Sequence, residues 1–245
     1  MQVLNRFIIY NRKFCSKLEE SFPTFFMGKT NSTDDLNNRI AKSLTDLKPR
    51  RIIEVGGIDR PLLTKNNDYE YIGIDIEFCE NHYSIYDKFI VSSIEEKNDE
   101  KAELIISTTL LEHVKDNKKS LNTMYDSLTS GGEMHHYVPS KNHPYSIALR
   151  IVGPRMQKIL IKHLRPHAAD VTGYPAFFNL CGVNEMKREM EKIGFNNINI
   201  TPYYRATDYF GFFIPLYLIV SLLENIFELL GLSFFAAGMV ISAKK

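Results

Sequence analysis

The chain has 245 residues and nearly balanced charge, with 30 Lys and Arg against 29 Asp and Glu and a formal net charge of +1. Its 44% hydrophobic and 24% charged fractions are those of a globular protein and exclude disordered, collagen-like and coiled-coil classes. The near-zero net charge argues against a nucleic-acid partner. The three cysteines, Cys15, Cys79 and Cys181, lie far apart and encode neither a disulfide framework nor a metal site.

Two apolar stretches bear on targeting. The N-terminal residues mix apolar and basic side chains, but their longest apolar run, FIIY, is too short for the core of a signal peptide. Tyr209 to Leu223 has no charge, yet Pro215 interrupts it and it is shorter than the ~20 residues that span a bilayer. We therefore expect a cytoplasmic protein in which residues 1–32 form a helical extension.

From residue 33 onward, strand-like and helix-like patterns alternate, which is typical of a parallel sheet. Apolar residues at helical spacing predict a helix that begins at 32–35 and that Pro49 closes. Further helices are expected at 116–128 and at 183–193, where Gly194 supplies the cap. Short β-branched runs predict strands at 50–55, 69–75, 88–93, 102–107, 133–139, 196–204 and 234–243. The sequence thus predicts a doubly wound α/β domain at 33–245, with insertions at about 143–181 and 208–231.

The first two predicted strands end in residues suited to a nucleoside ligand. RIIEVGG places Glu54, Gly56 and Gly57 at the carboxyl end of a strand, where open α/β sheets bind ligands and where glycine allows close backbone approach. Asp75 ends the next strand, the position from which a carboxylate accepts hydrogen bonds from ribose hydroxyls. A dinucleotide site would need GxGxxG opening a helix, and Pro61 fits that pattern poorly.

Together with two downstream segments, these motifs resemble the class I S-adenosylmethionine-dependent methyltransferases over about residues 33–245. STTLLEHVKD is similar to the segment after the fourth strand in one branch of that family, and LTSGGEMHHYVP is similar to its fifth strand. The resemblance implies a Rossmann-like, seven-stranded, mostly parallel sheet whose last strand is antiparallel. It implies S-adenosylmethionine as cofactor, bound by Glu54, Gly56, Gly57, Asp75, Ser93, Ile94, Ser107 and Thr108. Glu112 and His113 are expected to open a helix and to be structural.

One departure concerns the glycine loop. Where the family has GxGxG, this chain has GGID, which is one residue shorter and lacks the later glycines. A tighter loop can still present backbone amides to the cofactor. It is also what a methyltransferase-like binding or scaffold module without activity would show. Both alternatives stay open at this point.

A hydroxyl nucleophile would need a base, and histidines cluster near the predicted ends of the fourth and fifth strands. Because strand side chains alternate, His135 and His136 point to opposite faces and at most one faces a ligand. We favour His136 or His143 as the catalytic base. Each is also compatible with a hydrogen-bonded packing role.

The two expected insertions have the charge and hydrophobicity of segments that contact a membrane surface. Between Met134 and Ala169 there are six basic residues and no acidic one. A helix from Pro154 to Arg165 would place Arg155, Lys158, Lys162 and Arg165 on one face. A second helix, from about Leu216 to Leu230, has a wide apolar face. We expect peripheral contact with anionic lipid without spanning, although packing within the chain or in a homodimer would also cover the apolar face.

The acceptor is predicted from a weaker likeness. GYPAFFNLCGVNEM and YYRATDYFGFFIPLY are similar to segments of methyltransferases of polysaccharide or glycolipid biosynthesis. This likeness implies O-methylation of a sugar or a lipid-linked glycan, with Tyr174, Tyr203, Tyr204 and Arg205 at the substrate. Methylation of nucleic acid ranks last, because the chain has no NPPY-type segment and no dominating basic surface.

Overall fold

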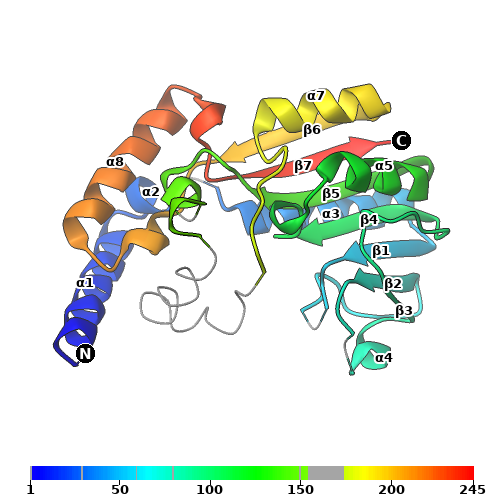
Figure 1. Cartoon of the computed structure of the whole chain (residues 1–245), viewed down its shortest axis with the longest axis horizontal. Coiled ribbons are helices and arrows are strands. Elements are labelled where there is room, and N and C mark those ends of the chain that lie inside the picture. Colours follow the sequence, from blue (N-terminus) through cyan, green and yellow to red (C-terminus); the bar gives the residue numbers. More distant parts are fainter. Residues whose placement is uncertain (1, 29, 59, 79, 149, 154–173) are drawn as a thin grey trace. The chain divides into compact units, whose positions relative to one another are not determined.

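The computed structural model describes residues 2–28, 30–58, 60–78, 80–148, 150–153 and 174–245 (Figure 1). The chain divides into two compact units. The sheet unit comprises Ser32–Pro139, Phe177–Thr201 and Met239–Lys245, and the helical unit comprises Met1–Asn31, Ser140–Ala176 and Pro202–Gly238. The extension expected at 1–32 and most of the two expected insertions therefore group in one unit.

The sheet has seven strands in the order β3-β2-β1-β4-β5-β7-β6. They are β1 (Arg51–Val55), β2 (Glu70–Asp75), β3 (Lys88–Val91), β4 (Ala102–Thr108), β5 (Leu128–Pro139), β6 (Asn196–Tyr203) and β7 (Gly238–Lys244). The first five pair in parallel. The start of β5 bonds to the end of β7, since Gly131 N–H donates to the Lys245 carbonyl, and the Ser140 N–H donates to the carbonyl of Ala237. The last strand is antiparallel, and the predicted fold class is confirmed.

The register of the parallel strands aligns their carboxyl ends. Val55 pairs with Ile74, and Asp75 pairs with Val91. Thus the glycines after β1 lie beside the end of β2, which in turn lies beside the end of β3. This is the arrangement that brings motifs from separate segments of the chain to one edge of the sheet.

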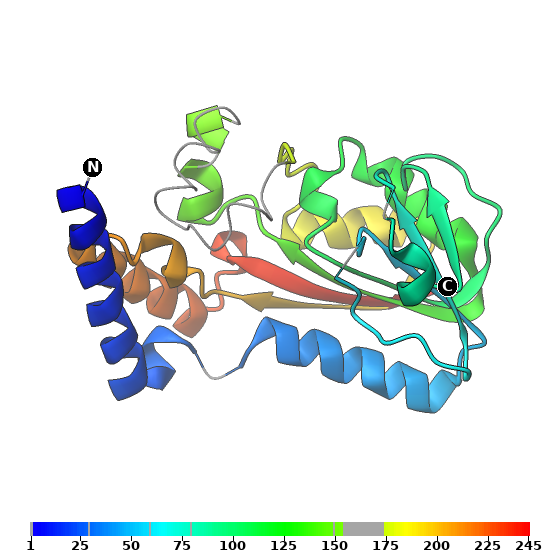
Figure 2. The ribbon, with the colours of Figure 1, turned by 90° about the horizontal axis from the view of Figure 1, so that it is seen from below.

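Helices cover both faces of this sheet. In Figure 2, α3 (Ser32–Leu47) runs along one face, and α5 (Asn117–Ser127) and α7 (Val183–Ile193) lie on the other, with the short α4 (His82–Ile85) before β3. The predicted bounds of α3 and α7 are confirmed. Asp34 and Asp35 stand in the first turn of α3, where acidic side chains favour the helix dipole. Gly194 ends α7 in the left-handed conformation, with φ of +111°.

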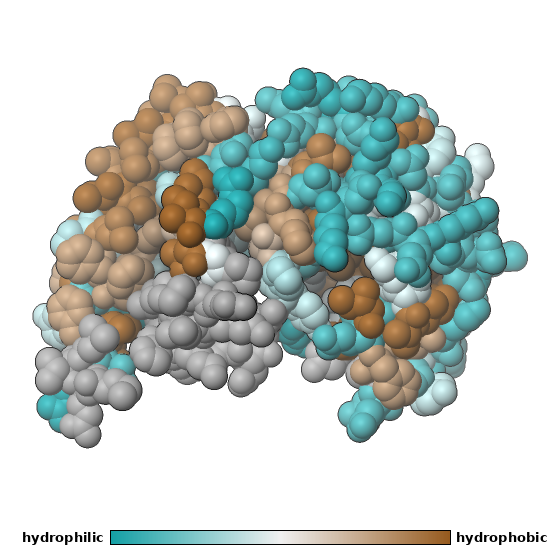
Figure 3. All heavy atoms as spheres, in the orientation of Figure 1, coloured by the Kyte–Doolittle hydropathy of each residue, from teal (hydrophilic) through white to brown (hydrophobic). Residues whose placement is uncertain are grey.

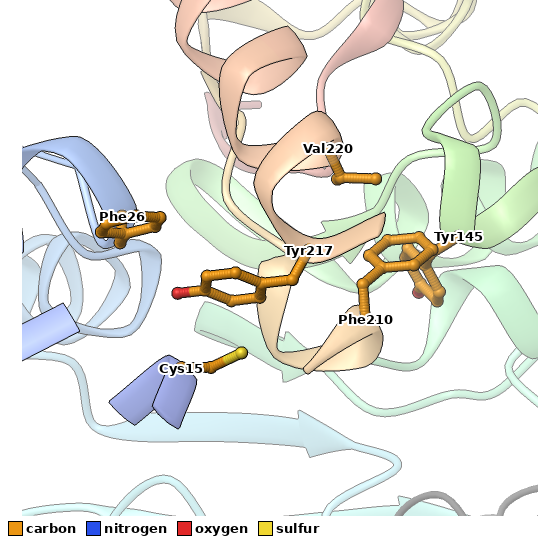
Figure 4. Packing of buried hydrophobic residues seen from close by; sticks show 6 residues of the cluster. All are labelled: Cys15, Phe26, Tyr145, Phe210, Tyr217 and Val220. Carbon is orange, nitrogen blue, oxygen red and sulfur yellow. The ribbon is translucent and has the colours of Figure 1, made fainter. Parts of the chain in front are cut away.

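The helical unit contains α1 (Gln2–Ser21), α2 (Pro23–Phe26), α8 (Ile214–Leu229) and the 3-10 turns η3 (Thr207–Phe210) and η4 (Ser233–Phe235); residues 144–148 and 150–153 are also helical. Its three chain segments share one apolar cluster, shown in Figure 4: Cys15, Phe26, Tyr145, Phe210, Tyr217 and Val220. The rings of Phe26 and Tyr217 stack with centroids 5.3 Å apart. Burial of these side chains joins the three segments into one folded unit.

Within the described part of the chain, α8 and the other helices are too short or too polar to cross a bilayer. The basic helix expected from Pro154 to Arg165 lies outside the described residues.

Candidate active site

The loop after β1 is a tight glycine turn. Gly56 has φ of +78° and donates its N–H to the carbonyl of Ile74 at 2.9 Å, which ties the turn to β2. A Cβ on Gly57 would lie 2.5 Å from the hydroxyl of Tyr86 and 2.6 Å from the carboxyl carbon of Glu54. Both glycines are therefore required by local geometry. No helix follows them in the described residues 56–58 and 60–69, so the chain reaches β2 through a loop alone.

Glu54 is completely buried beneath this turn, and protein donors bind both of its oxygens. The hydroxyls of Tyr71 and Tyr86 donate to Oε2, the latter at 3.3 Å, and the Leu62 N–H donates to Oε1 at 3.0 Å. Burial raises the pKa of Glu54 to about 7, although these hydrogen bonds oppose the shift. A ligand would have to displace one of these donors to reach the carboxyl group. Glu54 thus shapes the loop, and its predicted contact with the cofactor stays a prediction.

Asp75 presents a half-buried carboxyl at the end of β2. Its Oδ1 accepts the N–H of Glu77 at 3.0 Å, and burial raises its pKa. Ile94 is buried and Ser93 half-buried after the neighbouring β3, where the Ser93 hydroxyl accepts the N–H of Glu95 at 3.1 Å. The structure therefore brings these predicted residues to adjacent strand ends. Oxygens of Asp75 remain able to accept from two vicinal hydroxyls.

Ser107 and His136 form a buried pair across β4 and β5, and Thr108 follows at the half-buried end of β4. The Ser107 hydroxyl lies 2.7 Å from Nδ1 of His136. The Nε2 atom of His136 is buried and bonds to no group in the described residues. Burial, with a smaller contribution from His135, lowers the pKa of His136 to about 3. The ring is neutral at physiological pH and has one nitrogen free for a ligand.

His135 confirms the predicted alternation, because its ring turns to the opposite face of β5. Nε2 lies 2.7 Å from the Ser43 hydroxyl on α3, and Nδ1 lies 2.8 Å from the Ser242 hydroxyl on β7. Both ring nitrogens are thus engaged: Nε2 joins β5 to α3, and Nδ1 joins β5 to β7. Only His136, of these two neighbours, is placed to meet a ligand.

The helix expected to open at Glu112 does not begin there. The segment Leu111–His113 is a single 3-10 turn, and α5 begins only at Asn117 after the cap Asp116. Glu112 is buried, and its Oε2 bonds to no group in the described chain. Burial raises its pKa to about 8, so the carboxyl is largely protonated at neutral pH. The spacing of LLEHV does not predict this burial. The segment is held by residues distant in the sequence, since the N–H groups of Phe177 and Phe178 donate to the Glu112 carbonyl.

The second predicted base belongs to the helical unit. Nε2 of His143 lies 3.1 Å from Oε1 of Glu224, and Nδ1 accepts the N–H of Tyr145 at 3.3 Å. Both ring nitrogens are therefore engaged, and the ring is fully buried. This arrangement suits a structural pair better than a free base.

The four predicted substrate residues also belong to the helical unit. Arg205 donates to Asn225 at 3.0 Å and to Glu228 at 2.5 Å. Tyr204 is buried, Tyr203 half-buried, and Tyr174 exposed. The cofactor residues and His136 lie in the sheet unit, so the structure separates the predicted site residues into two sets, one in each unit.

A comparison with protein families decides the class. The model of a methyltransferase domain matches residues 30–200, more than half of the chain. The chain belongs to this family. The resemblance to S-adenosylmethionine-dependent methyltransferases and the predicted enzyme class are therefore confirmed. No curated protein sequence matches the chain.

Solved structures show the same fold at low identity. The CurJ carbon methyltransferase is 15% identical with a TM-score of 0.52, covering 86% of this methyltransferase and 53% of CurJ, so the chain spans about half of that protein. A SAM-dependent methyltransferase from Archaeoglobus fulgidus is 16% identical with a TM-score of 0.50, covering 95% and 100%. The [4+2]-cyclase SpnF is 12% identical with a TM-score of 0.54, covering 86% and 80%. Because one of these proteins is a cyclase, the fold alone does not specify the acceptor or the reaction.

Proposed function

We propose that this methyltransferase transfers the methyl group of S-adenosylmethionine to a hydroxyl of a sugar or lipid-linked glycan. The observation that supports it most is the convergence of Gly56, Asp75, Ile94 and Ser107 at the carboxyl ends of four neighbouring parallel strands. A solved relative, the phosphoethanolamine N-methyltransferase 2 of Haemonchus contortus, is a complex with this cofactor.

The residues at this edge fit the cofactor. Asp75 has oxygens available for the ribose hydroxyls, the apolar Ile94 suits an adenine ring, and the glycine turn allows close backbone approach. Glu54 would support the turn from below through Tyr71 and Leu62. When bound, S-adenosylmethionine supplies an electrophilic methyl group on a sulfonium.

The protein's chemical task is to align the acceptor and to remove its proton. His136 is neutral, and with Nδ1–H donating to Ser107 its Nε2 lone pair can accept a hydrogen bond from the acceptor hydroxyl. It can take the proton as the new carbon–oxygen bond forms, because the methylated oxygen is then strongly acidic. The Ser107 hydroxyl holds the orientation of the ring, and it can pair with either tautomer because a hydroxyl both donates and accepts. Glu112, protonated at neutral pH, would donate a hydrogen bond to the acceptor without adding charge. Positioning supplies most of the remaining acceleration.

Two measurements test this proposal. Titration calorimetry with S-adenosylmethionine and its demethylated product should show binding by the purified protein. Cells given labelled methionine should then incorporate label into a lipid or polysaccharide fraction only when the active protein is present. Cofactor binding without any transfer would favour the inactive binding module, and label confined to nucleic acid would favour the third alternative. The predicted cytoplasmic location and homodimer stay predictions.

A further inference from the structure

The outer face of α8 is apolar and exposed along the whole helix. Tyr217, Val220, Ser221 and Glu224 point inward and are buried. The opposite side exposes an apolar face, which consists of Leu218, Ile219, Leu222, Leu223, Ile226, Leu229 and Leu230. Leu229 is 85% exposed and Ile219 57%. Figure 3 shows this face as the brown surface over α8. So large an apolar patch marks an interaction surface.

The apolar face of α8 has no unpaired charge. Glu224 is buried beneath it, and Glu228, the one charged residue exposed on this fully described helix, pairs with Arg205 at 2.5 Å. The helix has 16 residues, whereas a spanning helix needs ~20. It is therefore suited to lie in the plane of an interface and not to cross it.

A second exposed surface on α1 combines aromatic and basic side chains. Phe7, Tyr10 and Phe14 follow one another at i, i+3 and i+7, and all three are exposed. Beside them runs a basic stripe at i, i+7 and i+11, formed by Arg6, Lys13 and Lys17. No acidic residue precedes Glu19 in the sequence.

The two helices belong to the same unit and bond directly to each other. The Oδ1 atom of Asn11 accepts the N–H of Ile214, the first residue of α8, at 3.1 Å. The Tyr217 hydroxyl donates to Glu19 at 2.9 Å. The α1 and α8 surfaces therefore belong to two helices that pack on each other in one unit, and exposed Phe22 and Met27 near α2 add further apolar area.

We propose that the helical unit docks on an anionic lipid bilayer, with the apolar face of α8 inserted among the lipids and the basic stripe of α1 on the headgroups. Apolar area together with several cations is the combination that reversible membrane binding requires. Tyrosine favours the headgroup level, which suits Tyr10. The sequence analysis assigned the basic surface to residues 154–165, whereas this proposal assigns it to α1.

A second copy of the chain is the competing occupant. A two-fold dimer through the apolar face of α8 would not use the basic stripe of α1. Anionic lipid would pair with that stripe as well as cover the apolar face. The charge of α1 therefore favours the bilayer over a homodimer.

Vesicle co-sedimentation tests the docking surface. The full-length protein should pellet with phosphatidylcholine vesicles that contain phosphatidylglycerol and should remain in the supernatant with phosphatidylcholine alone. Added salt should release it. A triple variant, Arg6→Gln with Lys13→Gln and Lys17→Gln, should lower the partition coefficient by about tenfold or more. The pair Leu222→Gln and Leu229→Gln should lower it by about tenfold or more at every salt concentration, since buried leucine side chains are lost from the lipid.

Matched controls come from the sheet unit. The charge control removes three positive charges from the exposed side of α7, with the substitutions Lys187→Gln, Arg188→Gln and Lys192→Gln. The apolar control removes two exposed aromatic side chains, with the substitutions Phe78→Gln and Tyr83→Gln. Both controls should bind vesicles like the wild type. Wild-type protein that stays in the supernatant with anionic vesicles at low salt overturns the proposal, even if a variant misfolds. So does a sedimentation-equilibrium dimer that the Leu222 and Leu229 pair dissociates while vesicle binding is unchanged.

The docking surface would hold the methyltransferase at a membrane, and it is tested separately from the proposed methyl transfer. The vesicle assay contains neither cofactor nor acceptor, so binding to anionic vesicles without methyl transfer would reject only the proposed activity. Transfer by a protein that ignores vesicles would reject only the docking surface.

Discussion

The hydroxyl of Ser107 lies 2.7 Å from Nδ1 of His136, and both side chains are completely buried at the junction of β4 and β5. Protein groups use both ring nitrogens of His135 and His143, whereas Nε2 of His136 meets no partner in the described chain. A buried imidazole nitrogen without a partner costs folding free energy unless a ligand supplies one. The pair is therefore the best candidate for contact with the reacting groups.

We predict that His136→Ala lowers methyl transfer by about 10²-fold or more while S-adenosylmethionine binding, measured by calorimetry, is retained. Ser107→Ala should lower transfer less, because it removes only the group that orients the ring. His135→Gln, on the opposite face of β5, is the control and should affect the free energy of unfolding but not the turnover of folded enzyme. Full turnover by His136→Ala would exclude the proton transfer proposed for this ring.

Asp75→Asn should weaken cofactor binding by about 1–3 kcal/mol, because the amide keeps the shape but removes the charged acceptor for ribose hydroxyls. The variant can still accept the N–H of Glu77, so the turn after β2 should persist. Glu77→Gln changes the same net charge on an exposed side chain and should leave the dissociation constant unchanged. Equal losses of cofactor affinity in Asp75→Asn and Glu77→Gln would mean that the affinity depends on the net charge of the protein and not on the ribose contact.

Gly57→Ala should destabilise the protein by about 1–3 kcal/mol in urea unfolding and also weaken cofactor binding, because the new Cβ would overlap the hydroxyl of Tyr86 and the carboxyl of Glu54. Gly131→Ala is the comparison. Gly131 has φ of +79° but nothing within 4 Å of its Cβ position, so alanine there should cost only about 1 kcal/mol of backbone strain and leave cofactor binding intact. A larger loss of stability in Gly131→Ala than in Gly57→Ala would show that the turn after β1 can rearrange to accept the new methyl group.

Local patterns in the sequence were enough to predict the strands and the long helices of the sheet unit, but not the short α4. The bounds of α3 follow from its capping residues and Pro49, and those of α7 from Gly194. The order of strand ends then places Asp75 and Ser107 at one edge, since parallel strands share their carboxyl side.

The sequence patterns did not predict the contacts between residues far apart in the chain. Tyr71 and Tyr86 bind Glu54 only because two strands and a turn fold together, and no spacing rule signals that. His143 was expected near the end of the fifth strand, but the chain leaves the sheet at Pro139, and Glu224, 81 residues further on, engages the ring. The common core of Cys15, Tyr145 and Tyr217 likewise joins segments that the sequence presents as a separate extension and insertions.

The buried carboxyl groups predict that stability falls in alkaline solution. Burial raises the pKa of Glu112 to about 8 and that of Glu54 to about 7, against about 4.5 for the free side chain. Between these values the folded protein holds protons that the unfolded chain has released, so its free energy of unfolding decreases as pH rises. Glu112 alone should account for about 2 kcal/mol between about pH 6.5 and 9. The lowered pKa values of His135 and His136 act in the opposite direction, but below about pH 6.5, outside this interval.

Urea unfolding at several pH values, with Glu112→Gln beside the wild type, measures the contribution of Glu112. Because glutamine is neutral at every pH, the variant should lose less stability than the wild type as pH rises. It should be the more stable of the two at about pH 9, where the wild type holds a buried carboxylate whose Oε2 has no hydrogen-bond partner in the described chain and whose Oε1 lies 3.7 Å from a neutral His113 ring. Glu191→Gln, exposed on α7, is the control and should follow the wild-type curve. Parallel curves for Glu112→Gln and the wild type would mean that Glu112 titrates as a solvated side chain, and its proposed role as a neutral hydrogen-bond donor to the acceptor would then be wrong.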